Sequence, residues 1–264
     1  MTSTATASTF PAVDRDELEA RVKSMYREVA ETPDGDFHFE MGRALAERLG
    51  YDPDALDRIP VAAIDSFAGV GHFLDLAGIQ PGETVLDLGS GSGMDSLLAA
   101  LATGSAGRVI GLDMTDAQRE KAARLAHEGG FDQMEFHPGY IEAPPFPDAS
   151  VDVVISNGVI NLSADKPRVF AEAARVLKPG GRLALADIVT ESPLPESVSC
   201  DATLWAACIG GASQQDDYRA AIEAAGLVIH TFREHPEYHF LTESARGACE
   251  KWGVKSISLL AIKA

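Results

Sequence analysis

The sequence feature that most constrains the fold is a regular alternation of short apolar strands and amphipathic helices, which begins near residue 83. Four apolar runs bounded by glycine or charged residues are typical of buried parallel strands, at residues 84–88, 108–112, 151–155 and 182–186. Helical patterns at 116–128 and 166–177 lie between them. This alternation predicts a doubly wound α/β fold, with helices on both faces of a seven-stranded, mostly parallel sheet.

Weaker patterns complete the predicted domain. The sequence Lys-Pro-Gly-Gly at 178–181 should end the preceding helix and turn the chain, because proline and glycine stop helices. The other expected elements are a strand at 134–137, a helix from 213 to 225 that stops at Gly226, a strand from 227, and a final strand at 256–262.

The first 50 residues follow a helical pattern instead. Apolar residues recur at threes and fours from residue 14 and again at 44–49, and the sequence Thr-Pro-Asp-Gly at 32–35 separates the two stretches. The region therefore predicts two helices. Residues 1–13 are rich in Thr, Ser and Ala and predict a disordered tail.

Acidic residues outnumber basic residues, which limits the partners. The chain has 40 Asp and Glu against 22 Lys and Arg, a formal net charge of -18, so its surface should repel phosphate backbones and acidic membranes. No apolar run approaches the roughly 18 to 20 residues that cross a bilayer, and the first residues lack the pattern of a secretory signal. We predict a cytoplasmic protein that binds neither nucleic acid nor membrane.

The cysteines predict neither a disulfide framework nor a metal site. Cys200, Cys208 and Cys249 are odd in number, and their spacing matches no common zinc pattern. We expect reduced thiols and no bound metal.

The candidate ligand site is a glycine-rich loop that leaves the first predicted strand. Glycines allow the backbone to turn sharply and to approach a ligand closely, at the carboxyl edge of the sheet where α/β folds bind ligands. The next predicted strand ends in Asp113, 20 residues beyond Gly93, where a carboxylate can accept hydrogen bonds from both hydroxyls of a ribose. The loop residues expected at the ligand are Asp87, Gly89, Ser90, Gly91 and Gly93.

The glycine loop has two possible interpretations, each a class of protein that binds a nucleotide cofactor. A dinucleotide-binding oxidoreductase would have the spacing Gly-x-Gly-x-x-Gly, whereas residues 89–93 have Gly-x-Gly-x-Gly after an acidic residue. The spacing favours S-adenosylmethionine over NAD. Asp113 could also be an ordinary surface acid, but the coincidence of loop, strand and acid favours a ligand-binding role.

The loop, the acid at 113 and the turn at 178–181 resemble the class I S-adenosylmethionine-dependent methyltransferases, which have a Rossmann-like fold. The resemblance implies a helical lid and connector at 14–80 and a cofactor-binding domain at 81–264. It also implies further cofactor contacts, although Ile141 could equally be a core residue and Glu142 a solvated charge. The residues implied are Met114 after the acid, Tyr140, Ile141 and Glu142 after the third strand, and Ser156 and Asn157 at the end of the fourth.

Residues 111–115, 156–166, 205–212 and 253–258 together resemble the arsenite methyltransferases. Those enzymes hold thiophilic arsenic through several cysteines. This sequence has Val70 and Gly158 at two family cysteine positions, and Cys208 matches the third. Cys200 lies eight residues before Cys208 and could supply a second thiol.

The resemblance also indicates where the methyl acceptor should bind. Tyr26, His38 and His72 lie in the region that usually covers the active site of class I enzymes, so with Cys208 they are the candidate catalytic residues. Each histidine could equally be structural, and Cys208 could be a buried core residue.

We therefore predict a methyltransferase that acts on a small-molecule acceptor. Arsenite methylation through Cys200 and Cys208 is an alternative. A non-catalytic protein that binds or senses S-adenosylmethionine is an alternative of another class. The sequence identifies neither the acceptor nor the oligomeric state.

Overall fold

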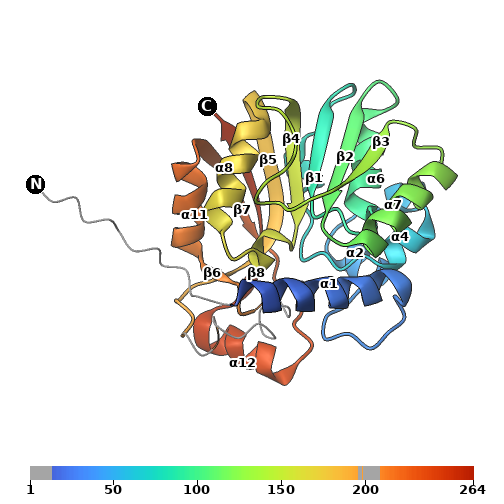
Figure 1. Ribbon diagram of the computed structural model, residues 1–264. Helices are drawn as coiled ribbons and strands as arrows, with labels where there is room; N and C mark the ends of the chain where they lie inside the picture. The colour runs from blue at the N-terminus through green and yellow to red at the C-terminus, as the bar shows by residue number, and fades with distance from the viewer. Residues whose placement is uncertain (1–13, 196–197, 199–208) are drawn as a thin grey trace, which may run out of the picture.

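A twisted sheet runs through the middle of the protein, with helices on both of its faces (Figure 1). The computed structural model describes residues 14–195, 198 and 209–264. The strand order is β3-β2-β1-β4-β5-β8-β7, and the two-residue β6 pairs with β5. The strands are β1 (Thr84–Leu88), β2 (Arg108–Asp113), β3 (Met134–Pro138), β4 (Val151–Asn157), β5 (Leu177–Thr190), β6 (Ser213–Gln214), β7 (Leu227–Glu234) and β8 (Lys255–Lys263).

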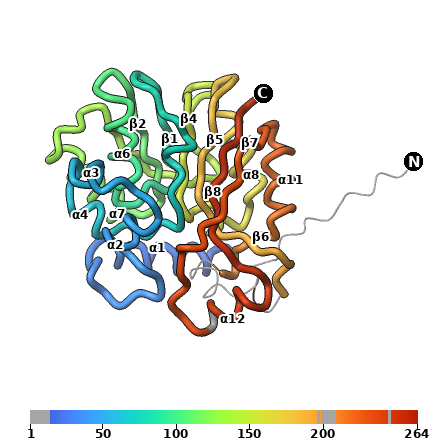
Figure 2. The backbone as a smooth tube through the Cα atoms, turned by 180° about the vertical axis from the view of Figure 1, so that it is seen from behind, coloured from blue at the N-terminus to red at the C-terminus, as the bar shows by residue number. Residues whose placement is uncertain are grey.

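The sheet is mostly parallel, as the sequence predicts. β1 pairs in parallel with β2 and β4, and β2–β3 and β4–β5 are also parallel. β8 runs antiparallel to both β5 and β7. Figure 2 shows β8 from behind, inserted between its two neighbours. The carboxyl ends of β1, β2 and β4 therefore meet at one edge of the sheet.

The helices differ from the prediction mainly outside the central alternation. The break after the first helix extends to Gly42, short helices follow it in the connector, and the C-terminal helix α12 was not predicted. The helices are α1 (Arg15–Glu31), α2 (Arg43–Arg48), α3 (Pro53–Leu56), α4 (Val61–Asp65), α5 (Leu74–Ala77), α6 (Met94–Thr103), α7 (Asp116–Glu128), α8 (Lys166–Val176), α11 (Gln215–Ala224) and α12 (Glu243–Trp252), with a 3₁₀ turn η1 at Ile160–Leu162.

Alternate side chains of the central strands feed two apolar cores, one on each face of the sheet. Val85 of β1 packs into the core that includes α6 and α7, whereas Leu86 of the same strand packs into the core with α8 and α11. Residues buried on both faces explain why these strands are continuous apolar runs rather than alternating ones.

The turn at 178–181 is accommodated as a bulge rather than as a separate loop. Val151 lies opposite Leu177 and Val153 lies opposite Arg182, so the intervening residues of β5 are extruded from the pairing. Gly180 has φ +75°, a left-handed conformation that favours glycine.

α1 lies across the edge of the sheet at which β1, β2 and β4 end (Figure 1). It begins at Asp14, whose carboxylate accepts hydrogen bonds from the backbone N–H groups of Asp16 and Glu17, both at 3.1 Å. Leu18, Val22 and Val29 are buried along one side of the helix. Within the part of the chain that the structure describes, no helix has the length and apolar character needed to cross a membrane.

Candidate cofactor site

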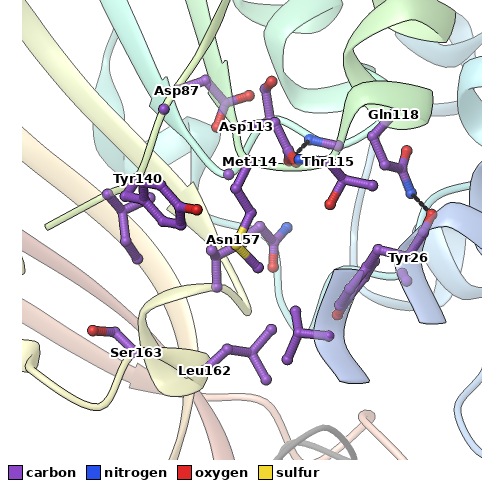
Figure 3. Close-up of a pocket in the computed structure, with 18 of the residues that line it drawn as sticks. Tyr26, Asp87, Asp113, Met114, Thr115, Gln118, Tyr140, Asn157, Leu162 and Ser163 are labelled. Atoms are coloured by element: carbon purple, nitrogen blue, oxygen red, sulfur yellow. Dashed lines mark hydrogen bonds between the residues drawn. The ribbon is translucent and has the colours of Figure 1, made fainter. Parts of the chain in front are cut away.

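A cavity of about 460 Å³ lies between α1 and the carboxyl edge of the sheet (Figure 3). Its volume falls within the usual range of small-molecule sites, about 300 to 1,000 Å³. α1 contributes Leu18, Val22 and Tyr26 to its wall. Of the predicted cofactor residues, those on the cavity are Asp87, Gly89, Ser90, Gly91, Gly93, Asp113, Met114, Tyr140, Ile141, Glu142 and Asn157.

The glycine loop turns back against the end of β2. Its backbone N–H groups at Gly89 and Ser90 donate to the carbonyl of Leu112, at 2.8 and 3.1 Å. Gly89 has φ +73°, and a Cβ atom there would overlap the side chain of Val159. Gly91, at φ +52°, is uncrowded by comparison, because the nearest atom to an added Cβ would be Oε1 of Gln118 at 3.8 Å, an ordinary contact distance. The loop therefore leaves room for a ligand at Gly91.

Asp113 orders this loop while facing the cavity. Its Oδ2 accepts from the backbone N–H of Gly91 at 2.9 Å, and its Oδ1 accepts from that of Thr115 at 2.8 Å. Burial raises the pKa of the carboxyl, and these two hydrogen bonds oppose that effect. An ionised carboxylate has about four acceptor positions, so these two backbone bonds do not exhaust its capacity to accept hydrogen bonds from a ligand.

Two further carboxyl groups lie below the loop. Oδ2 of Asp87 accepts from the hydroxyl of Ser96 at 2.5 Å. Burial, together with the charge of Asp95, raises the pKa of Asp87 to about 8. Asp95 accepts from the Tyr51 hydroxyl at 2.6 Å, and burial raises its pKa to about 6. These two carboxyl groups would stabilise a positively charged ligand group when ionised, and they would repel a phosphate.

Asn157 connects Asp95 to the connector segment. Its Nδ2 donates to Asp95 at 2.9 Å and to the carbonyl of Gly71 at 3.1 Å, and its Oδ1 accepts from the backbone of Val70 at 2.8 Å. Ser156 has a different place from the one expected. Its hydroxyl donates to the carbonyl of Leu88 at 2.9 Å, and the residue lies outside the cavity lining. We correct its assignment to a contact between neighbouring strands.

The residues after β3 are tied to α1. The hydroxyl of Tyr140 donates to Glu19 at 2.7 Å, and Lys23 donates to both, at 2.7 Å to Glu19 and 3.1 Å to Tyr140. Ile141 is 8% exposed and contributes an apolar surface to the cavity. The carboxylate of Glu142 accepts from the hydroxyl of Ser163, so it is not a free solvated charge.

The candidate catalytic residues occupy different surroundings. Tyr26 lines the main cavity, and His38 lines a second cavity of about 20 Å³ that also touches Tyr26. His72 lines neither cavity, and its ring packs on Tyr51 with centroids 4.6 Å apart. Burial lowers the pKa of His72 and so favours the neutral imidazole. Its place outside both cavities, rather than its charge, argues against a catalytic role. Cys200 and Cys208 lie outside the described residues.

Cys249, on α12, is partly buried and lies outside both cavities. Over residues 14–195, 198 and 209–264, no group of three His, Cys, Asp or Glu side chains is arranged to hold a metal ion.

Sequence reasoning missed several polar cavity residues, among them Asp95, Gln118 and Ser163. Gln118 lies in the first turn of α7, two residues beyond the start of a helix that was correctly predicted. Its position only becomes significant once α1 is folded over that helix. Ser163 follows η1, a 3₁₀ turn that no periodic pattern in the sequence indicated.

The strand order with its antiparallel β8, the glycine loop at the end of β1 and the acid at the end of β2 define a class I S-adenosylmethionine-dependent methyltransferase. Residues 79–226 match the family described as a methyltransferase domain. This match covers more than half of the sequence, so the chain belongs to that family.

Several relatives are arsenite methyltransferases. The chain is 45% identical over 182 residues to that of Halobacterium salinarum, a match that covers 69% of this chain and 46% of the relative. It is 42% identical over 137 residues to the Homo sapiens enzyme, covering 48% of this chain and 36% of the relative. The matches thus span less than half of the length of these relatives.

Solved structures give the same fold. An arsenic(III) S-adenosylmethionine methyltransferase from Chlamydomonas reinhardtii has a TM-score of 0.63 and 33% identity, over 84% of this chain and 74% of that chain. A geranyl diphosphate C-methyltransferase from Streptomyces coelicolor has a TM-score of 0.69 over 96% of this chain and 100% of that chain, and at 20% identity it is evidence of fold alone.

The first prediction tests Asp113 as the ribose ligand. Asp113→Ala should weaken binding of S-adenosylhomocysteine by about 1 to 3 kcal/mol, because it removes charge-assisted hydrogen bonds to the ligand and to the loop. Titration calorimetry on the folded variant measures this. The matched control is Asp116→Ala, at the start of α7, because the Asp116 side chain is 76% exposed and its loss should leave the affinity unchanged. Wild-type affinity in Asp113→Ala would exclude the ribose role.

Proposed function

We propose that this protein transfers a methyl group from S-adenosylmethionine to a small-molecule acceptor. The observation that carries the proposal is the position of the Asp113 carboxylate, which faces the cavity while it holds the backbone of the glycine loop at Gly91. Enzymes of this kind need a ribose acceptor and a close backbone approach at the same place.

The residues on the cavity suit the parts of the cofactor. Asp113 is the acceptor for the ribose hydroxyls, and Met114 and Ile141 form an apolar slot for the adenine. The uncrowded position of Gly91 gives space for the methionyl part, with Asp87 below it. When bound, S-adenosylmethionine supplies an activated methyl group on a positively charged sulfur.

Methyl transfer is an in-line displacement, in which a lone pair of the acceptor forms a bond to the methyl carbon as the carbon–sulfur bond breaks. The main tasks of the protein are therefore to align the reactants and to exclude water. α1 covers the cavity and brings Leu18, Val22 and Tyr26 onto it. Tyr26 and His38 are the described residues that we propose for acceptor contact or proton removal.

Two neighbouring positions that are cysteines in the related arsenite methyltransferases are Val70 and Gly158 in this protein. Val70 is 1% exposed, and a Cβ atom at Gly158 would lie 3.2 Å from Cγ1 of Val70. The two positions at which arsenite methyltransferases have cysteines are therefore neighbours here, and the buried side chain of Val70 packs directly against Gly158. Because trivalent arsenic prefers thiolates, we propose that the acceptor is not arsenite.

Two alternatives remain. An arsenite methyltransferase could use Cys200 and Cys208, which lie outside the described residues. A non-catalytic S-adenosylmethionine-binding protein would have the same cofactor cavity. Formation of S-adenosylhomocysteine with any acceptor, in a screen of thiols, phenols, amines, carbon nucleophiles and arsenite, distinguishes an enzyme from a sensor.

The second prediction concerns arsenite. With glutathione as the thiol, the purified protein should form no methylated arsenic above background, since two of the three thiol positions are Val70 and Gly158. Chromatography of arsenic species after incubation with S-adenosylmethionine measures this. Arsenite methylation that is lost in Cys200→Ser or Cys208→Ser would establish the alternative.

The matching gain-of-function variant is Val70→Cys with Gly158→Cys. Because the two positions adjoin, the pair should bind arsenite more tightly than the parent protein does. Gly158 has φ +72°, so the cysteine there should cost about 1 to 2 kcal/mol of stability. Unchanged arsenite affinity in the folded double variant would show that the two thiols do not converge.

The third prediction concerns pH. In the free protein Asp87 and Asp95 have pKa values of about 8 and about 6, so both become protonated as pH falls. A cationic ligand favours the ionised carboxylates, so the affinity for S-adenosylmethionine should increase with pH, by up to about tenfold per pH unit for each proton released.

S-adenosylhomocysteine is the control ligand, because it has the same amino and carboxyl groups but lacks the sulfonium charge. The ratio of the two affinities should increase between about pH 5 and about pH 8, and Asp87→Asn should flatten the increase. Calorimetry at each pH measures the ratio. A ratio that does not change with pH would remove these carboxylates from sulfonium recognition.

A further inference from the structure

Gln118 bonds to two parts of the protein that are far apart in sequence. It is 2% exposed, in the first turn of α7. Its Oε1 accepts from the hydroxyl of Ser92 at 2.5 Å, and its Nε2 donates to the backbone carbonyl of Tyr26 at 2.8 Å. Figure 3 shows the second bond, from Gln118 toward the helix that carries Tyr26.

The two partners line the same cavity from different elements. Ser92 is 4% exposed and lies in the glycine loop between Gly91 and Gly93, whereas Tyr26 lies in α1. Both bonds are buried or partly buried, where a lost hydrogen bond is costly because water does not replace it. One amide side chain thus connects the cofactor loop to the helix that covers it.

Other bonds hold α1 without reaching the loop. Lys121, one turn further along α7, donates to the carbonyl of Ala30 at 2.9 Å and to the hydroxyl of Ser66 at 2.7 Å. Glu19 and Lys23 bond to Tyr140 after β3. These contacts attach α1 near its C-terminal end and along its N-terminal half, and neither set involves Ser92.

We propose that Gln118 is a positioning residue that couples occupation of the glycine loop to closure of α1. The inference rests on the proposed function, since it requires a ligand in the same cavity. A ligand that orders the loop fixes the Ser92 hydroxyl, which fixes the amide of Gln118 in the orientation that donates to Tyr26. Because such coupling is reciprocal, a closed α1 increases ligand affinity by the same factor.

The experiment is hydrogen exchange of the α1 amides, with and without saturating S-adenosylhomocysteine. In the wild-type protein the ligand should slow exchange in α1. Ser92→Ala should abolish this ligand-dependent slowing, although it leaves the bond between Gln118 and Tyr26 in place. Gln118→Glu should abolish it from the other side, because it keeps an acceptor for Ser92 but replaces the Nε2 donor with an oxygen that faces the Tyr26 carbonyl.

Lys121→Met is the matched control. It removes a bond between α7 and α1 that does not touch the loop, so exchange in α1 should be faster in the free protein, while the ligand still slows it. Circular dichroism and thermal unfolding establish that each variant is folded. Both Ser92→Ala and Gln118→Glu should also bind S-adenosylhomocysteine about 5-fold or more weakly by calorimetry, the lower range of measured couplings.

The outcomes separate the two proposals. If the wild-type protein does not bind S-adenosylhomocysteine, both the proposed function and the coupling are wrong. If it binds the ligand but Ser92→Ala retains the full slowing of α1 exchange at saturation, only the coupling is wrong and Gln118 simply anchors the helix. Loss of the slowing in Lys121→Met as well would also contradict a specific role for Gln118.

Discussion

The arrangement of the site depends on the carboxylate at the end of β2. Asp113 accepts from Gly91 on one oxygen and from Thr115 on the other, so it fixes the glycine loop and the start of α7 at the same time. α7 in turn presents Gln118 and Lys121 to α1. The hydrogen bonds of Asp113 at the end of β2 thus help to position both the glycine loop and, through α7, the helix α1. A ribose bound at this carboxylate would therefore be connected to the glycine loop, to α7 and to α1.

Much of the fold could be predicted because it depends on local patterns. Buried parallel strands are apolar throughout, and the helix at 116–128 was predicted with the bounds that α7 has. The glycine loop was identified for the same reason, since its spacing is a local requirement of the backbone. The pattern at 44–49 predicted α2, whereas the connector helices α3, α4 and α5 and the C-terminal α12 were missed. α3, α4 and α5 have only four or five residues, too few to show a clear period, and tertiary packing, rather than propensity, stabilises such short helices.

The site residues that could be predicted are those that directly follow a predicted strand in the sequence. Asp113 and the loop residues follow strands directly, so their convergence at one edge could be expected from the sheet alone. The positions of His72 and Ser156 could not. His72 packs on Tyr51 and Ser156 bonds to Leu88, contacts between segments that only the folded chain brings together. The neighbouring positions of Val70 and Gly158 likewise appear only in three dimensions, and they turn two separate substitutions into one altered site.

The most direct test of this account is a crystal structure of the protein with S-adenosylhomocysteine. The account predicts that the ligand lies between α1 and the glycine loop, with both ribose hydroxyls donating to Asp113 and with the adenine beside Met114 and Ile141. A ligand bound elsewhere, or bound in this cavity with its ribose away from Asp113, would contradict the central claim.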